Sequence, residues 1–175
     1  MRPLLIAAAL AISASAFAQT PPETVALTFN GGDGKPKGTG QLTAAPKGVL
    51  LRLSLTGLTP GWHAIHFHSV ADCSDPKLQK SGAHVMPMGV KTPHGLLNPA
   101  GPDAGDLPNV WAADDGTVHA EVFSPFVSLK GGGSTTALED ADGSALIVHA
   151  SPDDGLTQPI GGAGDRVACA MIPKG

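Results

Sequence analysis

The sequence has no tyrosine, few other aromatic residues and few charged ones, and each shortage narrows the possible classes of protein. Aromatic residues make up 4% of the chain and charged residues 15%, with a formal net charge of −4 at pH 7. A mildly acidic balance argues against nucleic acid, because proteins that bind it show a basic face. Beyond residue 18 no apolar run is long enough to span a bilayer. We therefore expect neither nucleic acid nor a membrane among the partners.

The longest apolar run lies at the start of the chain. Arg2 precedes an apolar stretch that continues to about Ile12, and Ala16-Phe17-Ala18 provides the small residues that a signal peptidase reads. The run is too short for a membrane anchor, and no cysteine near the cleavage site could carry a lipid. We predict that residues 1–18 are a signal peptide that is removed and that residues 19–175 form one domain, either periplasmic or secreted.

Cysteine is scarce too, with only Cys73 and Cys169 in the chain. In an exported protein an even number of cysteines predicts a disulfide, and the alternative is a pair of buried free thiols. A bond between them would tie the loop after His68 to the last strand of the chain.

Glycine and proline are abundant instead, with 23 and 16 residues respectively, and they separate short stretches in which apolar and polar residues alternate. This alternation indicates half-buried strands. No segment has the period of a helix. Eight short strands without helices predict an all-β, antiparallel barrel or sandwich with two long irregular loops. The expected strands cover residues 24–29, 39–43, 49–55, 61–68, 109–112, 117–123, 145–149 and 166–172, and the loops cover residues 69–108 and 150–165.

Two histidines on one strand are the first sign of chemistry. Alternate side chains of a strand point to opposite faces, so His66 and His68 project together while Ile65 and Phe67 point the other way. Two imidazoles on one face make half a metal site, although such a pair can also lie on a surface. By the same parity His63 lies on the opposite face, and His119 is expected to be an exposed strand residue.

Three further histidines lie in or beside the loops. His84 and His94 fall in the first irregular stretch, and His149 ends the apolar run 145–148. Loops of this length without secondary structure are usually functional. Met86 and Met88 follow His84 and could bind copper through their sulfur atoms, but we expect them to pack the loop against the barrel.

A series of short motifs, in this order, resembles the copper/zinc superoxide dismutase family in its bacterial exported form. The motifs are His66-Phe67-His68, Ser81-Gly82-Ala83-His84, His94-Gly95, Ala104 to Asn109, Leu146 to His149 with Asp153-Asp154-Gly155, and Gly164 to Cys169. The resemblance covers nearly all of residues 19–175. It implies an eight-stranded antiparallel Greek-key barrel with two long functional loops.

The resemblance also implies roles for individual residues. The copper ligands would be His66, His68, His84 and His149, and His84 would bridge to a zinc site that it shares with His94, Asp103 and Asp106. Asp153 would link a copper histidine to a zinc histidine, and such partners orient ligating imidazoles. His84 and Arg166 would be the catalytic residues, Arg166 receiving the substrate anion.

The zinc side departs from the family pattern, because Asp103 stands where the family usually has a histidine. Carboxylate oxygen is an acceptable zinc ligand, so a site of two histidines and two aspartates is one reading. A copper-only site, or zinc held weakly, is the other. A second carboxylate would also raise the proton affinity of the bridging His84.

The resemblance implies copper-dependent dismutation of superoxide to dioxygen and hydrogen peroxide. Few cations flank the predicted site, so we expect a slower enzyme than its relatives, one that attracts the anion through Arg166 and through Lys77, Lys80 or Lys91. The alternative is an exported copper carrier or buffer with little or no turnover. The sequence leaves both a homodimer and a monomer open.

Overall fold

The computed structural model describes residues 20–87 and 90–175, so the predicted signal peptide and Met88 lie outside the described residues. The strands are β1 (Thr24–Asn30), β2 (Pro36–Ala45), β3 (Gly48–Leu55), β4 (Gly61–His63), β5 (Ile65–His68), β6 (Val110–Ala112), β7 (Val118–Ser124), β8 (Val127–Ser128), β9 (Thr136–Ala137), β10 (Ser144–His149) and β11 (Arg166–Ile172). One turn of 3-10 helix, η1, spans Gln79–Ser81. Over the described ranges, no helix is long and apolar enough to cross a membrane.

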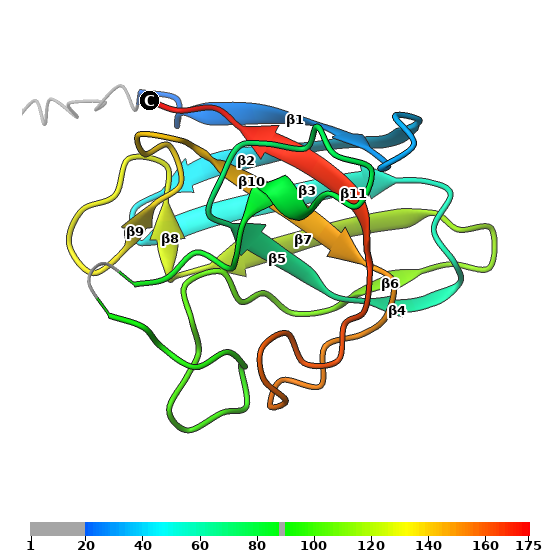
Figure 1. The fold of residues 1–175 in the computed structure, drawn as a ribbon. Coiled ribbons are helices and arrows are strands. Elements are labelled where there is room, and N and C mark those ends of the chain that lie inside the picture. Colours follow the sequence, from blue (N-terminus) through cyan, green and yellow to red (C-terminus); the bar gives the residue numbers. More distant parts are fainter. Residues whose placement is uncertain (1–19, 88–89) are drawn as a thin grey trace, which may run out of the picture.

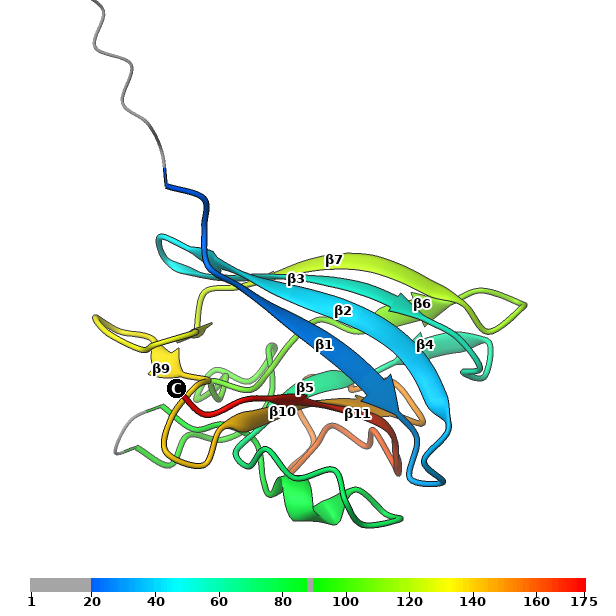
Figure 2. The same cartoon turned by 90° about the horizontal axis from the view of Figure 1, so that it is seen from above.

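Seven strands form one curled antiparallel sheet in the order β5-β10-β11-β1-β2-β3-β7 (Figure 1). The strands β4 and β6 pair as a separate antiparallel ribbon, in which β4 runs through Ala64 directly into β5 while β6 lies beside β7. The ribbon therefore stands between the two ends of the curled sheet, and Figure 2 shows the resulting two layers.

The predicted all-β antiparallel architecture is confirmed. Counted with β4 and β5 as one interrupted strand, the eight predicted strands are all present. The short pair β8–β9, which is parallel, was not predicted, because two residues per strand are too few to give an alternating pattern.

The core lies between the two layers and is filled by alternate residues of the strands. In β1 the buried side chains are Val25, Leu27 and Phe29, and the residues between them are exposed. In β3, Leu53 and Leu55 point inward in the same way. Burial of such side chains contributes roughly 1.5–3 kcal/mol each, so these alternating strands supply the main stabilisation of the barrel.

The strands β5 and β10 differ, since every residue in both is buried. Phe67 and Leu146 face the main core, whereas Ile147 on the other face packs with Leu78 and Cys169. The outer face of these two strands is thus covered by the loop that follows β5. Polar side chains on that face are removed from water and need partners.

The β4–β6 ribbon carries an exposed aromatic pair. Trp62 and Trp111 lie directly opposite each other in the register, with ring centroids 5.2 Å apart and ring planes at 74°. They are 53% and 52% exposed. Opposite residues of an antiparallel pair share a face, so the two rings contact each other edge to face on the outer side of the ribbon.

Candidate metal centre

Four histidine side chains meet at the outer face of β5 and β10. His66 and His68 come from β5, and His149 comes from the end of β10. His84 comes from the loop after β5, where its backbone pairs with that of His68 in an isolated antiparallel β-bridge. All four are buried, and each can place one ligand atom within 4.8 Å of the others. The structure thus brings together all four residues that the resemblance assigns to copper. We call them the four-histidine group.

One ring nitrogen of each residue in this group has no hydrogen-bond partner among the described residues. These atoms are His66 Nδ1, His68 Nε2, His84 Nε2 and His149 Nε2, and all of them are buried. The cost of burying an unpartnered polar atom is about 1–3 kcal/mol, so four such atoms in one place indicate a missing binding partner.

The second nitrogen of each ring is held by the protein. His66 Nε2 lies 3.0 Å from Asp153 Oδ2, His68 Nδ1 2.9 Å from the Gly82 carbonyl, His84 Nδ1 2.9 Å from Asp103 Oδ2, and His149 Nδ1 3.2 Å from the Gly164 carbonyl. Each of these nitrogens donates to an oxygen, which leaves the lone pair on the unpartnered nitrogen. A neutral imidazole fixed in this way is the form that binds copper and zinc. The residues fit a metal ion.

A second group adjoins the first through His84. His84, His94, Asp103 and Asp106 are buried and can also place one ligand atom each within 4.8 Å of the others. His94 Nδ1 lies 2.5 Å from Asp106 Oδ1, while His84 Nδ1 lies 3.6 Å from the same oxygen. We call these residues the His/Asp group, and their nitrogen and oxygen atoms match the ligands that zinc prefers.

Asp103 reaches this group although its side chain is shorter than that of histidine. Its Oδ1 accepts a hydrogen bond from the Gly105 N–H at 2.9 Å, which turns Oδ2 toward His84 at 2.9 Å and His94 at 4.0 Å. Asp106 Oδ2 in turn accepts the Asp103 N–H at 3.0 Å. The tight turn over residues 103–106 therefore brings the shorter side chain close, with no water needed between.

Asp153 joins the two groups from outside. Its Oδ2 lies 3.0 Å from His66 Nε2 and its Oδ1 lies 3.1 Å from His94 Nε2. Gly161 packs on this carboxylate with φ +60°, and a Cβ there would lie 1.7 Å from Asp153 Oδ1. Only glycine fits that approach and that backbone conformation.

The carboxylates set the protonation of the metal-free His/Asp group. Burial lowers the pKa of His94, but hydrogen bonds to Asp106 and Asp153 outweigh it and raise the pKa to about 10. Burial likewise opposes protonation of His84, yet Asp103 and Asp106 raise its pKa. The raised pKa of His84 agrees with the direction predicted from the extra carboxylate at Asp103.

In the rest of the four-histidine group the pKa values are lowered instead of raised. Burial, followed by repulsion from His66, lowers the pKa of His149 to about 3. Burial also holds the pKa of His68 well below its usual range. These imidazoles stay neutral at physiological pH and keep their lone pairs available for a metal.

Arg166 stands beside the four-histidine group with its guanidinium fixed by one loop. It donates to the Leu78 carbonyl at 2.9 Å, Ser81 Oγ at 2.8 Å and the Gly82 carbonyl at 2.8 Å. Arg166 and His149 together line an open cavity of about 410 Å³. A fixed cation at the mouth of a site suits recognition of a small anion.

Four other charged residues of interest take different positions. Lys77 and Asp165 line the same cavity, whereas the Lys80 amine turns away to Ser74 Oγ at 3.2 Å. Lys91 is not part of the cavity lining. Of the three lysines that were predicted to attract the anion, only Lys77 therefore lines the cavity beside Arg166.

The remaining histidines lie where strand parity placed them. His63 is buried, with Nδ1 2.6 Å from the His149 carbonyl and Nε2 2.7 Å from the Thr59 carbonyl, so neither nitrogen is free for a metal. His119 is exposed on β7. Met86 is partly buried, and its carbonyl accepts a hydrogen bond from Thr136 Oγ1 at 3.3 Å.

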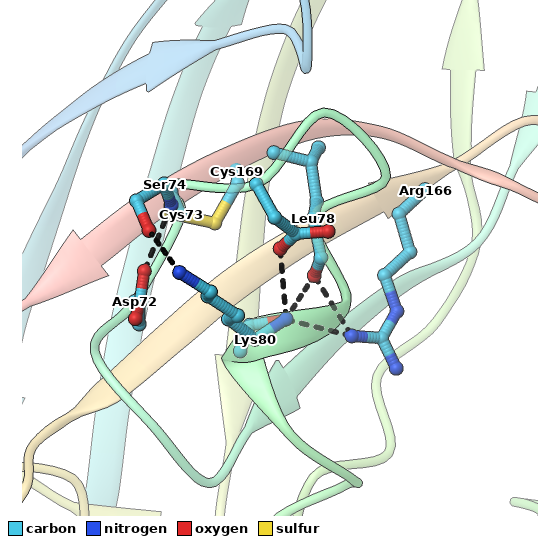
Figure 3. Close-up of a disulfide and its surroundings, with 9 residues drawn as sticks. Asp72, Cys73, Ser74, Leu78, Lys80, Arg166 and Cys169 are labelled. Atoms are coloured by element: carbon cyan, nitrogen blue, oxygen red, sulfur yellow. Dashed lines mark hydrogen bonds between the residues drawn. A yellow bond between two sulfur atoms is a disulfide. The ribbon is translucent and has the colours of Figure 1, made fainter.

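The predicted disulfide is present. Cys73 and Cys169 are bonded, with their Cα atoms 5.9 Å apart, and neither cysteine is free. Figure 3 shows the bond next to Leu78 and on the same side of the sheet as Arg166. The disulfide thus anchors the loop that holds the guanidinium.

The sequence did not predict three residues that hydrogen-bond to the site residues and fix their positions. They are Ser81, Asn109 and Gln158, and their hydrogen bonds to the backbone or side chains of site residues span 85, 44 and 64 positions of the chain. Ser81 and Asn109 lie inside motifs that carried the resemblance, which is a signal that could have found them. Nothing local marks Gln158.

A curled antiparallel barrel in which one imidazole joins two adjacent groups of buried ligands defines a class of β-barrel proteins with two neighbouring metal sites. Comparison with known proteins gives the family. Residues 36–172 match the family model for copper/zinc superoxide dismutase. A Cu-Zn superoxide dismutase of Caulobacter vibrioides is 60% identical over 141 residues, which cover 81% of this chain and 80% of the relative.

Two solved structures agree. A superoxide dismutase-like protein from Bacillus subtilis has a TM-score of 0.78 and 32% identity, over 84% of this chain and 97% of that protein. The Cu/Zn superoxide dismutase from Brucella abortus has a TM-score of 0.67 and 30% identity, over 86% of this chain and 99% of that one. The chain belongs to the copper/zinc superoxide dismutase family, whose members dismutate superoxide and use copper and zinc as cofactors.

Proposed function

We propose that this protein dismutates superoxide outside the cytoplasm, with copper in the four-histidine group and zinc in the His/Asp group. The observation that carries the proposal is the set of four buried, unpartnered ring nitrogens whose opposite nitrogens are all held by oxygen atoms. Copper, when bound, supplies the one-electron chemistry, because it cycles between two oxidation states.

The protein's own residues bind and orient the substrate. Arg166 places the superoxide anion in the cavity beside His149, since its three acceptors leave the guanidinium with one fixed orientation. His84 holds or releases a proton at Nε2, and the neighbouring Asp103 and Asp106 favour its protonated form. Neutral His68 and His149 stay available as ligands.

We propose that Asp103 is a zinc ligand, which gives a site of two histidines and two aspartates. Its Oδ2 lies within 4.0 Å of both ring nitrogens that face it. The extra negative charge, together with Asp165 in the cavity lining, weakens the attraction of an anion. We accordingly expect a slower enzyme than relatives with more positive sites.

The extracytoplasmic location rests on two features. The chain begins with a sequence typical of a signal peptide, and Cys73 and Cys169 form a disulfide of the kind that persists in oxidising compartments.

The test combines metal analysis with an assay. Protein purified from its own compartment should contain copper and zinc, and copper-loaded protein should consume superoxide. His149→Ala should abolish that activity by removing one ligand. A copper-loaded protein that binds the metal but consumes no superoxide would instead be a carrier. The fixed position of Arg166 counts against that alternative, because storage of copper needs no anion site.

A further inference from the structure

Two exposed or partly exposed carboxamide side chains form hydrogen bonds with the backbone of residues in or beside the two metal groups. The first is Asn109, which lies just before β6. Its Nδ2 donates to the Asp153 carbonyl at 2.8 Å, and its Oδ1 accepts the Asp153 N–H at 2.9 Å. One side-chain amide thus satisfies both backbone groups of the residue whose carboxylate joins His66 to His94.

The second carboxamide repeats the arrangement on the zinc side. Gln158 Oε1 accepts the His94 N–H at 3.0 Å, and Gln158 Nε2 donates to the His94 carbonyl at 2.7 Å. Nε2 also donates to the Leu156 carbonyl at 3.1 Å, which braces the amide within its own loop. Within the described part of the chain, the His94 N–H has Gln158 as its hydrogen-bond acceptor.

These two contacts connect loops that are distant in sequence. Asp153 and Gln158 belong to the loop over residues 150–165, whereas His94 belongs to the loop before β6. His94 Nε2 returns to Asp153 Oδ1 at 3.1 Å. Backbone and ring of His94 are therefore both held by the later loop, while Asn109 fixes that loop against the barrel.

We propose that Gln158 and Asn109 are positioning residues, which hold His94 and Asp153 by their backbones so that the His/Asp group binds zinc tightly despite its second aspartate. An amide is suited to this task, because a reciprocal pair needs one donor and one acceptor on the same side chain. Groups behind the ligands orient them, and their loss typically lowers metal affinity by about 10–100-fold. The inference rests on the proposed zinc site.

The test uses Gln158→Glu, which preserves the shape and the acceptor but places a second oxygen against the His94 carbonyl. Gln158→Ala removes the contact, and Asn109→Asp makes the corresponding change at Asp153. Gln41→Glu is the matched control, because Gln41 is an exposed residue of β2 away from both groups. Zinc and copper affinities are measured by competition with chromophoric chelators, and the stability of the metal-free protein by urea denaturation.

Zinc affinity should fall about tenfold in Gln158→Glu, while copper affinity stays within about threefold, because Gln158 acts on His94, which is not in the four-histidine group. Gln41→Glu should behave as wild type. If wild type binds zinc and all three variants keep that affinity within twofold, the positioning role is wrong and the proposed function stands.

Other outcomes separate the remaining possibilities. If wild type itself binds no zinc, the proposed zinc site fails and the positioning role fails with it. If the Gln158 variants lose copper affinity as much as zinc affinity and the metal-free protein is destabilised as well, Gln158 only supports the loop in general, and the proposal is overturned. Asn109→Asp is not used for this comparison, because Asp153 also holds the copper ligand His66.

Discussion

Breaking the Cys73–Cys169 disulfide should destabilise the metal-free protein strongly. The two residues are 96 positions apart, and a cross-link that closes a loop of about that length lowers the entropy of the unfolded chain by the equivalent of about 4.7 kcal/mol at 25 °C. A domain of this size has a total free energy of unfolding of roughly 5–15 kcal/mol. Reduction should therefore remove between about 30% and nearly all of the free energy of unfolding.

The bond should also matter for the site. Cys169 packs with Leu78 in a small cluster, and the Leu78 and Gly82 carbonyls hold the Arg166 guanidinium. Once the loop is released from β11, Arg166 loses its fixed acceptors. Reduced, copper-loaded protein should consequently consume superoxide more slowly, even while copper stays bound.

The assay is urea denaturation of metal-free protein, followed by far-UV circular dichroism, in the oxidised and the reduced state. A double variant, Cys73→Ala with Cys169→Ala, serves as a second comparison. Both the variant and reduced wild type lack the cross-link, and the variant also lacks the two sulfur atoms, so the two differ only in packing. The dependence of stability on urea should steepen on reduction, because the unfolded chain then expands further. A loss of less than about 1 kcal/mol on reduction would refute the entropic reasoning.

Three further predictions concern the site. The pKa of His149 is lowered from 6.5 to about 3 in the metal-free fold, so the unfolded chain binds that proton more readily. Stability should then be lost as pH falls from about 6.5 toward 3. In His149→Gln the urea concentration at the unfolding midpoint should fall less steeply over this pH range than in wild type. Lys77→Ala should slow superoxide consumption about two- to threefold at low salt and weaken its salt dependence in stopped-flow assays, because Lys77 lines the cavity. Asp103→Asn should lower zinc affinity by at least about tenfold and lower the pKa of His84, as measured by chelator competition and by NMR titration.

Controls make these outcomes decisive. Lys80→Ala should leave the rate nearly unchanged, because its amine binds Ser74 outside the cavity lining. An equal effect of both lysine variants would point to net charge alone. If the urea midpoint of His149→Gln depends on pH between about 6.5 and 3 as it does in wild type, other groups govern the stability in acid. Full zinc affinity in Asp103→Asn would show that Asp103 is not a ligand.

Strand parity was enough to predict the arrangement around β5. The alternation of His66 and His68 with Ile65 and Phe67 requires two faces, and the structure gives each face its own environment. The same reasoning correctly excluded His63, whose nitrogens are taken by carbonyl groups. A two-residue period is a local property, so it can be read without knowing the fold.

The loops could not be predicted in this way. The resemblance placed His84, His94 and Asp103 at one site, but the turn that brings Asp103 within reach depends on the Gly105 N–H and on Asp106. The contacts of Gln158 with His94 link two loops 64 positions apart. Such hydrogen bonds depend on how the loops fold over the barrel, and they leave no periodic signal in the sequence.

The edge-to-face pair Trp62 and Trp111 has a practical consequence for spectroscopy. Since the chain contains no tyrosine and only these two indoles, its intrinsic fluorescence originates almost wholly from one corner of the barrel surface. Two rings 5.2 Å apart at 74° are close enough to couple their excited states, which should give a paired near-ultraviolet dichroism band. Because β4 continues through Ala64 into β5, this optical signal monitors the integrity of the strand that carries His66 and His68.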